Sequence, residues 1–417
     1  MMTKKNLAKA VTLSVLLMLP YGMAQAATTY TEAISGADDT YTGPQKTYND
    51  STKTYTYTLG GGAVLDLKTY YQGSSLINDD GIIVNSEKIV IDNTLDIKMH
   101  AGEQTGNYDP KVNSAIDVWG SDSLFDRRNG GNIEVTKSNG VIRLSGENNK
   151  LFLGNGNITL TNTNSYADAG IINMGYGDNN LAVYGTGTIK ADATYGGSRY
   201  NRLSAVHMDI NAANGNKIIL GYQGDYSDAD LEKFNDVDNL LETVKDLGKV
   251  ELNITATNIN ETNTQEATAK GIELDRAGEN SENAANNIIA AGDVKITTEA
   301  KTAGVSSYIT TSSIGVDVKS NTENITNIVA LKSADIEANA IATNDANITA
   351  IGILSASNAL NADTLVEIGE KSKIVVKTNA NNNAQLTGIY AFGAVSYEGN
   401  VTKLGDGVVN TAVIDIT

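Results

Sequence analysis

The chain has 417 residues, no cysteine, three prolines and 40 glycines, and its formal net charge is −18. A strongly acidic surface repels phosphates, so we expect no nucleic-acid partner. Without cysteine, packing and backbone pairing must stabilise the fold. His100 and His207 are the only histidines, which argues against a zinc site of familiar spacing and against a Ser/His/Asp triad. We therefore expect no cofactor, no metal and no catalytic residue.

Residues 1–26 have the pattern of a secretory signal peptide. A basic pair, Lys4–Lys5, precedes the apolar run Ala10–Leu19, and Ala24–Ala26 is a small-x-small cleavage site. The apolar run is shorter than the ~20 residues that a membrane-spanning helix needs. We therefore expect export through the inner membrane followed by cleavage.

Residues 27–75 are rich in tyrosine and threonine, and we interpret them as an N-terminal cap. Thr54–Leu59 and Ala63–Leu67 alternate like the two strands of a hairpin across Gly60–Gly62. A cap covers the first edge of a repeat array, which would otherwise pair with other chains. The alternative is a tyrosine-rich binding face.

Residues 76–417 form a repeat of about 30–40 residues, which is typical of a solenoid. Each unit opens with asparagine and an aliphatic anchor, continues with a second alternating run, and ends with alanine or glycine followed by a third run. The anchors are Leu151, Leu181, Ile218, Ile288, Ile328 and Leu365. The third runs begin at Ala115, Ala169, Ala205, Gly271, Gly315, Gly352 and Gly388. This pattern predicts three short strands per unit.

Three strands per unit favour an all-β fold, a parallel β-helix whose three-strand coils stack about 4.8 Å apart. A propeller blade would need four antiparallel strands, and helical repeats would need longer amphipathic runs. We expect the anchors to lie above one another in one buried column. Asparagines at one register predict a hydrogen-bonded ladder; they are Asn149, Asn179, Asn216, Asn287 and Asn327.

One insertion, residues 227–248, interrupts the repeat. Its apolar residues fall at helical spacing, Ser227 can cap the start and Gly248 can end it. We expect one amphipathic helix laid against the flank of the solenoid. The alternative is that its acidic face docks a partner or a cation.

The leader, the absence of cysteine and the Thr/Asn/Gly-rich units with variable loops resemble an autotransporter passenger domain of the adhesin-like kind, over residues 76–417. This resemblance implies a right-handed parallel β-helix, exported by an outer-membrane barrel translocator of a Gram-negative-type bacterium. The strands of such a barrel are not in this sequence. The sequence stops within a predicted strand at Val413–Thr417, so we expect a C-terminally truncated chain.

The resulting hypothesis is a secreted, surface-displayed protein that acts as an adhesin or structural surface protein and not as an enzyme. Its partner would be a protein or glycan on a host or neighbouring cell, or a second copy of the chain. The least repetitive stretch predicts the ligand-contact loop, formed by Trp119, Asp122, Asp126, Arg127 and Arg128.

The alternative is a β-helix polysaccharide lyase or hydrolase. Asp79, Asp80 and Asp117, together with the acids of the contact loop, could supply paired carboxylates, and Trp119 could stack on a sugar. Convergence of these side chains in a groove near Trp119 would favour the enzyme, whereas dispersed side chains would favour the adhesin.

Overall fold

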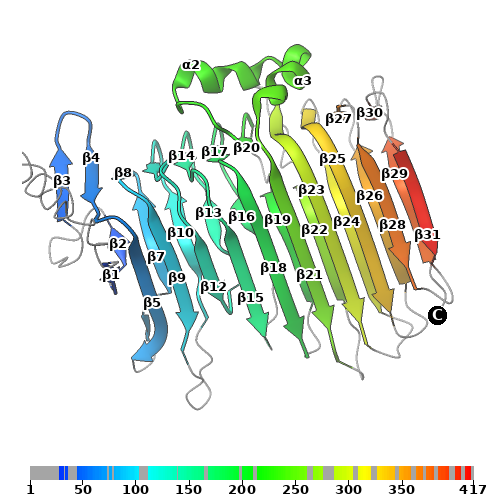
Figure 1. The fold of residues 1–417 in the computed structure, drawn as a ribbon, viewed down its shortest axis with the longest axis horizontal. Helices are drawn as coiled ribbons and strands as arrows, with labels where there is room; N and C mark the ends of the chain where they lie inside the picture. Colours follow the sequence, from blue (N-terminus) through cyan, green and yellow to red (C-terminus); the bar gives the residue numbers. More distant parts are fainter. Residues whose placement is uncertain are drawn as a thin grey trace, which may run out of the picture.

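The computed structural model describes most of residues 28–414 (Figure 1). The segments outside the description are 1–27, 32, 36–44, 73–74, 78, 103–110, 139, 164–167, 197–199, 210–213, 261–265, 276–285, 304–308, 321–325, 343–346, 358–362, 370–371, 380–383, 394–399, 405–408 and 415–417. The predicted signal peptide therefore lies outside the described residues. No helix in the described part of the chain is long and apolar enough to cross a membrane.

The described strands are arranged in three parallel ladders, and each repeat unit contributes one run to each ladder (Figure 1). The first ladder contains β4 (Thr54–Thr58), β8 (Lys88–Ile91), β11 (Leu124–Asp126), β14 (Lys150–Phe152), β17 (Leu181–Tyr184), β20 (Lys217–Leu220), β23 (Asn287–Thr302), β25 (Thr326–Ala342), β27 (Asp363–Ile368) and β30 (Asn400–Leu404). The second contains β1 (Thr29–Tyr30), β5 (Ala63–Gln72), β9 (Leu95–Ala101), β12 (Ile133–Thr136), β15 (Ile158–Thr163), β18 (Gly187–Tyr195), β21 (Val250–Asn258), the later halves of β23 and β25, β28 (Lys373–Thr378) and β31 (Val409–Ile414).

The third ladder forms a separate sheet. It contains β2 (Ile34–Ser35), β7 (Asp80–Asn85), β10 (Ser114–Trp119), β13 (Ile142–Leu144), β16 (Asp168–Met174), β19 (Tyr200–Asp209), β22 (Glu266–Asp275), β24 (Thr310–Ser320), β26 (Asn347–Ser357) and β29 (Ala384–Gly393). Two strands lie outside the ladders and pair antiparallel: β3 (Gln45–Asn49) with β4, and β6 (Ser75–Ile77) with β5. The structure is therefore mostly β with parallel strands, as predicted, and is compatible with a β-helix.

The predicted hairpin across Gly60–Gly62 is wrong. Tyr55 of β4 pairs in parallel with Ile89 of β8, and Leu65 of β5 pairs in parallel with Ile97 of β9. Both strands carry the same alternation as the repeat, so they pair with the next unit instead of with each other. Strands within residues 27–75 thus already belong to the ladders.

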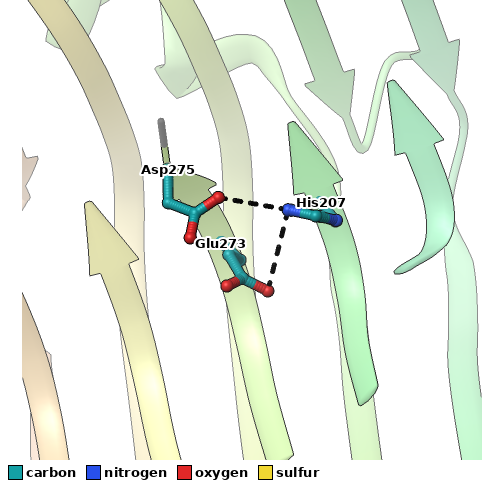
Figure 2. A group of neighbouring side chains, drawn as sticks. All are labelled: His207, Glu273 and Asp275. Atoms are coloured by element: carbon teal, nitrogen blue, oxygen red, sulfur yellow. Dashed lines mark hydrogen bonds and ion pairs between the residues drawn. The ribbon is translucent and has the colours of Figure 1, made fainter. Parts of the chain in front are cut away.

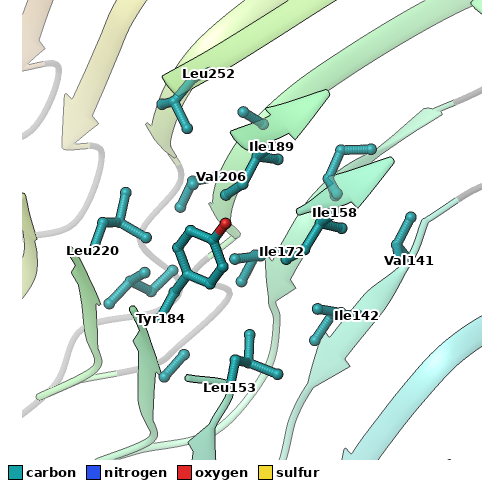
Figure 3. Close-up of a cluster of buried hydrophobic side chains, with 14 of the residues drawn as sticks. Val141, Ile142, Leu153, Ile158, Ile172, Tyr184, Ile189, Val206, Leu220 and Leu252 are labelled. Carbon is teal, nitrogen blue, oxygen red and sulfur yellow. The ribbon is translucent and has the colours of Figure 1, made fainter. Parts of the chain in front are cut away.

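The hydrophobic core lies between the three ladders. Alternate residues of each strand point inward, and Figure 3 shows Leu153, Ile172, Tyr184 and Leu252 meeting there from different ladders. These side chains are almost completely removed from water. Burial of a large aliphatic side chain contributes about 1.5–3 kcal/mol, so this continuous core is the main source of stability.

The expected single column of anchors is wrong, because the anchors divide between two faces. Leu151 pairs with Ala182 and not with Leu181, which is one residue earlier and points to the opposite face. The inward column is Leu151, Ala182, Ile218, Ile289, Val329 and Val366. The outward row of the same ladder is Leu181, Lys217, Ile288, Ile328 and Leu365.

The insertion covers this outward row, which explains why a row facing away from the core is apolar. Its helical segments are α2 (Asp228–Leu231), η1 (Glu232–Asn235), η2 (Val237–Asn239), α3 (Leu240–Thr243) and η3 (Val244–Asp246). Phe234 and Leu240 are buried in one cluster with Ile288 and Ile328. The prediction of a flanking helical insertion is confirmed.

The prediction of one continuous helix is wrong, since the chain is extended at Asp236, with φ −82° and ψ 90°. The predicted cap is confirmed: the side chain of Ser227 accepts a hydrogen bond from the Asp230 backbone N–H at 3.3 Å. Short turns let the insertion follow the surface of the ladder more closely than a straight helix could.

The asparagine ladder is confirmed, with Asn180 in the position predicted for Asn179. The backbone N–H of Asn149 donates to Asn180 Oδ1 at 3.0 Å, that of Asn180 to Asn216 Oδ1 at 2.8 Å, and that of Asn216 to Asn287 Oδ1 at 3.2 Å. Asn287 Nδ2 then donates to Asn327 Oδ1 at 3.1 Å. All five side chains are buried. Asn179 is exposed and has a left-handed φ of 57°.

Replacing Asn180 by alanine should destabilise the protein by at least about 2 kcal/mol. The Asn149 N–H and the Gly146 carbonyl, which Asn180 Nδ2 reaches at 2.6 Å, would each remain buried without this partner. The matched control is Asn179→Gly, which tolerates the left-handed backbone and should stay within about 0.5 kcal/mol of wild type. Urea unfolding followed by circular dichroism measures both, and equal midpoints for the two variants would contradict a structural role for the ladder.

Candidate functional site: a charged groove on the third ladder

The predicted contact-loop residues do not form one surface. Trp119 is 44% exposed at the end of β10, and Asp122 lies in the turn that follows it, with a left-handed φ of 55°. Asp126 and Arg127 are buried. The five residues therefore divide into three exposed residues, Trp119, Asp122 and Arg128, and the buried pair Asp126 and Arg127.

Asp126, Arg127 and Arg128 connect structural elements. Arg127 Nη2 donates to the Leu95 carbonyl of the second ladder at 2.6 Å, and burial lowers the pKa of Arg127 to about 10. Arg128 Nη2 lies 2.5 Å from Asp126 Oδ2, and Arg128 Nη1 donates to the Asp225 carbonyl at 3.1 Å. Asp225 lies just before the insertion, so the Arg128 contacts connect the start of the insertion to the first ladder.

The acids considered for the enzyme alternative do not form one group. Burial raises the pKa of Asp79 and of Asp117, and the nearby charge of Asp80 adds to both shifts. Asp117 of β10 lies 3.8 Å from Arg143 of β13, whereas Asp126 belongs to β11 of another ladder. Asp80 accepts hydrogen bonds from Asn113 Nδ2 at 3.0 Å and from Ser114 Oγ at 2.5 Å. In the described part of the chain, these carboxylates do not converge near Trp119.

A groove of about 610 Å³ lies instead on the third ladder, across β19, β22 and β24. Its lining is mainly polar and charged, and it includes Arg202, Ser204, His207, Asp209, Glu266, Lys270, Glu273, Asp275, Asp317 and Lys319. The groove thus gathers nine ionisable groups from three neighbouring strands.

The alternation of inward and outward side chains shifts by one residue in these strands, and this shift makes the surface concave. In β22, both Gly271 and Ile272 are buried between the outward residues Lys270 and Glu273, so the alternation slips by one residue. A Cβ on Gly271 would lie 2.3 Å from Ile296 Cγ2 of β23 and 2.5 Å from the Gly315 carbonyl oxygen. Glycine therefore lets the strand approach the core, and the outer face dips at this point.

Three side chains converge in the groove: His207 of β19, and Glu273 and Asp275 of β22 (Figure 2). His207 Nε2 lies 3.3 Å from Asp275 Oδ1 and 4.0 Å from Glu273 Oε2. His207 and Glu273 are direct partners in the register, and Asp275 follows Glu273 on the same face. Each of the three offers one ligand or proton-accepting atom within 4.8 Å of the others.

A second network fixes the orientation of Glu273. Ser204 Oγ donates to Glu273 Oε2, and Lys270 Nζ donates to Glu273 Oε1. The same ammonium lies 2.6 Å from Asp317 Oδ2, and Lys319 Nζ lies 2.9 Å from that oxygen. Buried ion pairs of this kind contribute little net stability because desolvation offsets their attraction, so they are weak evidence for a purely structural role.

The charges in the groove support one another. Burial lowers the pKa of His207, but the carboxylates of Glu273 and Asp275 outweigh this effect and hold the pKa above its ordinary value. Burial raises the pKa of Glu273, and the charges of Lys270 and His207 bring the net pKa below its ordinary value. Burial also raises the pKa of Asp275, but the hydrogen bond to His207 and the charges of His207, Lys270 and Lys319 together bring the net pKa below its ordinary value. Strongly perturbed groups in a cleft are typical of functional sites.

Sequence reasoning gave His207 little weight and did not identify this cluster. A usable signal was present, because His207, Glu273 and Asp317 are each the third residue of the phrase that begins at Ala205, Gly271 and Gly315. The register pairs them directly. The alternation of inward and outward residues shifts by one at the glycines, which brings Ser204 and Lys270 close to His207 and Glu273. The periodicity of the sequence alone does not predict this shift.

The ion pairs of His207 predict a pH-dependent stability. A pKa above the unfolded value of about 6.5 means that the contribution of His207 is full below that pH and is lost as pH rises through the raised pKa. In metal-free buffer, the melting temperature of wild type should exceed that of His207→Gln most at about pH 6, and the difference should shrink by about pH 9. His100→Gln is the matched control; a constant difference for His207→Gln would contradict the ion pairing. Asp209 and Lys270 also face this group, and the raised pKa of Lys270 keeps its ammonium charged over the tested range.

Comparisons of the chain with protein-family models, with curated proteins and with solved structures found no match.

Proposed function

We propose that the chain is the displayed part of a secreted, right-handed parallel β-helical protein with three strands per coil, of the autotransporter passenger kind. It acts by binding, as an adhesin or structural surface protein. The signal-peptide pattern of residues 1–26 supports export. The partner is a protein or glycan on a host or neighbouring cell.

The register of the ladders is the observation that carries this proposal. Three ladders run in parallel from the N-terminal strands to β29, β30 and β31, and each strand pairs with its counterpart in the next unit. Solenoids of this type present extended surfaces on which binding residues from successive units lie side by side. A rod of stacked coils places such surfaces away from the cell.

The exposed aromatic residues support contact with a partner. Trp119 is 44% exposed and Tyr176 is 65% exposed. The backbone of Ser145 pairs with the strand end that carries Trp119, and Gly175 pairs with the Leu144 carbonyl on the next strand. Trp119 is therefore aligned with Gly175, about two strand spacings or roughly 10 Å away, and Tyr176 is the next residue of the chain. Exposed aromatic side chains suit the flat faces of sugar rings or an apolar protein patch.

A polysaccharide lyase or hydrolase is the second candidate, and the acidic groups of the groove are the observation that favours it. The electrostatics of the groove argue against catalysis there. A glycoside hydrolase needs one carboxyl group with a raised pKa as general acid, whereas the pKa values of Glu273 and Asp275 are both lowered. Burial does raise the pKa of Asp117, with the Asp80 charge adding to the shift, but Asp117 lies outside the groove and faces Arg143. Burial lowers the pKa of Lys270, but Asp317 and Glu273 raise it far above its ordinary value, so this amine is a poor base.

Binding assays with the purified chain test the proposal. The chain should be retained on glycan arrays or fixed cell surfaces and should leave the length of added polysaccharides unchanged. Trp119→Ala should weaken retention by at least about fivefold, as expected when an exposed aromatic contact is removed. Ile259→Ala is the matched control, because Ile259 is similarly exposed at 46% but follows β21 on another ladder.

Two results would oppose the proposal. Equal losses for Trp119→Ala and Ile259→Ala would remove Trp119 from the contact surface. Shortened polysaccharide, or the ultraviolet absorption of an unsaturated uronate product, would replace the binding role by the enzymatic alternative.

A further inference from the structure

One imidazole and two carboxylates converge in the groove, and such a set of side chains can do more than form ion pairs. His207 Nε2, Glu273 Oε2 and Asp275 Oδ1 point toward one another from two adjacent strands (Figure 2). The two strands are held in register by the ladder, so the backbone positions of the three groups are fixed by parallel pairing and not by a loop. Sites built on strands keep their geometry better than sites on loops.

We propose that His207, Glu273 and Asp275 bind one divalent transition-metal ion of the Zn²⁺ class. The proposal is independent of whether the chain is displayed as an adhesin. It adds a site of defined chemistry to the third ladder.

The distances fit such an ion. Zn²⁺ binds histidine nitrogen and carboxylate oxygen at about 2.0–2.2 Å, which places neighbouring ligand atoms of a tetrahedral site roughly 3.3 Å apart. The separation of His207 Nε2 and Asp275 Oδ1 is already 3.3 Å. The separation of His207 Nε2 and Glu273 Oε2 is 4.0 Å, and all three ligand atoms lie within 4.8 Å of one another, so they need to move slightly closer to hold the ion.

The ligand types select the class of metal. Imidazole suits zinc, copper, nickel and iron, whereas Ca²⁺ and Mg²⁺ prefer sites made of oxygen alone. Two carboxylates and a neutral imidazole carry two negative charges, which match one divalent cation. Three protein ligands leave a coordination position for solvent or for a group on a partner.

The surroundings provide the support that metal ligands need. Ser204 Oγ donates to the same Glu273 oxygen that would bind the ion, while Lys270 holds the other oxygen. Two buried oxygens on either side of the cluster, Asn173 Oδ1 and Asp317 Oδ1, have no hydrogen-bond partner within the described residues. Asn173 is the register neighbour of His207, and Asp317 is that of Glu273. They offer acceptors for solvent bound to the ion.

Isothermal titration of the purified full chain with Zn²⁺, in a non-chelating buffer at fixed pH, tests the proposal. We expect one saturable site per chain, and Co²⁺ should show the visible absorption of a low-symmetry complex. Asp275→Asn, which keeps the shape of the side chain, should weaken Zn²⁺ binding at least tenfold. Ser204→Ala should weaken it by about 10–100-fold, as is usual for a residue that orients a ligand.

The matched control is His100→Gln. His100 is the other histidine of the chain, and its Nε2 lies 3.7 Å from one carboxylate, that of Asp66. Its replacement should leave Zn²⁺ binding unchanged. If His207→Gln fails to fold, Asp275→Asn carries the comparison, with circular dichroism as the check on folding.

Three outcomes would overturn the proposal. They are the absence of saturable Zn²⁺ binding by wild type, undiminished binding by folded Asp275→Asn, and tighter binding of Ca²⁺ than of Zn²⁺ in the same titration. Loss of binding in His100→Gln together with retention in Asp275→Asn would place the ion at the other histidine.

Discussion

Parallel pairing in register is the constraint on which the rest of the structure depends. Each strand of one unit lies beside its counterpart in the next, so a side chain at one position has the same position above and below it. The side-chain period of two residues then decides which face every residue occupies. Leu151 and Leu181 show this rule: Leu181 directly follows its asparagine and is aligned with Lys150, whereas Leu151 lies one residue further on, so the two leucines point to opposite faces.

Buried polar side chains are also aligned by the register, and those of the asparagine ladder form hydrogen bonds with their counterparts in the next unit. A single asparagine in an apolar interior would leave amide groups without partners, at a cost of about 1–3 kcal/mol. Asn149, Asn180 and Asn216 avoid this cost because each accepts from the backbone of its neighbour. The outward apolar residues Ile288 and Ile328 cannot be buried by the ladder itself. The insertion packs over them and buries them from outside.

Much of the fold was accessible from the sequence. The three runs of each unit, the helical insertion and the asparagine ladder follow from periodicity and turn chemistry. What failed were choices that differ by one residue or by one partner: Asn179 instead of Asn180, and a hairpin at Gly60–Gly62 instead of parallel pairing. Local patterns of alternation are identical in both cases, and the contacts that decide between them come from units 30 or more residues away.

The candidate site was harder to predict because it depends on positions at which the residue type differs between repeat units. The outward position of the third ladder is held in turn by Ser35, Ile83, Asp117, Arg143, Asn173, His207, Glu273, Asp317, Leu354 and Tyr390. Ionisable or amide groups fill the positions between Ile83 and Leu354. The described strands supply this position ten times, but only His207 and Glu273 stand beside the second carboxylate of Asp275.

A stack of repeated parallel strands tolerates such a concentration of charge when its stability is mainly a sum over neighbouring units. The cost of desolvating His207 and Glu273 is borne by two adjacent strands, while the aliphatic columns beneath them continue without interruption through Val206 and Ile272. The inner face of β19 and β22 therefore forms the core, and the outer face of the same two strands lines the groove. This separation lets the outer face carry chemistry that the packing of the inner face neither requires nor opposes.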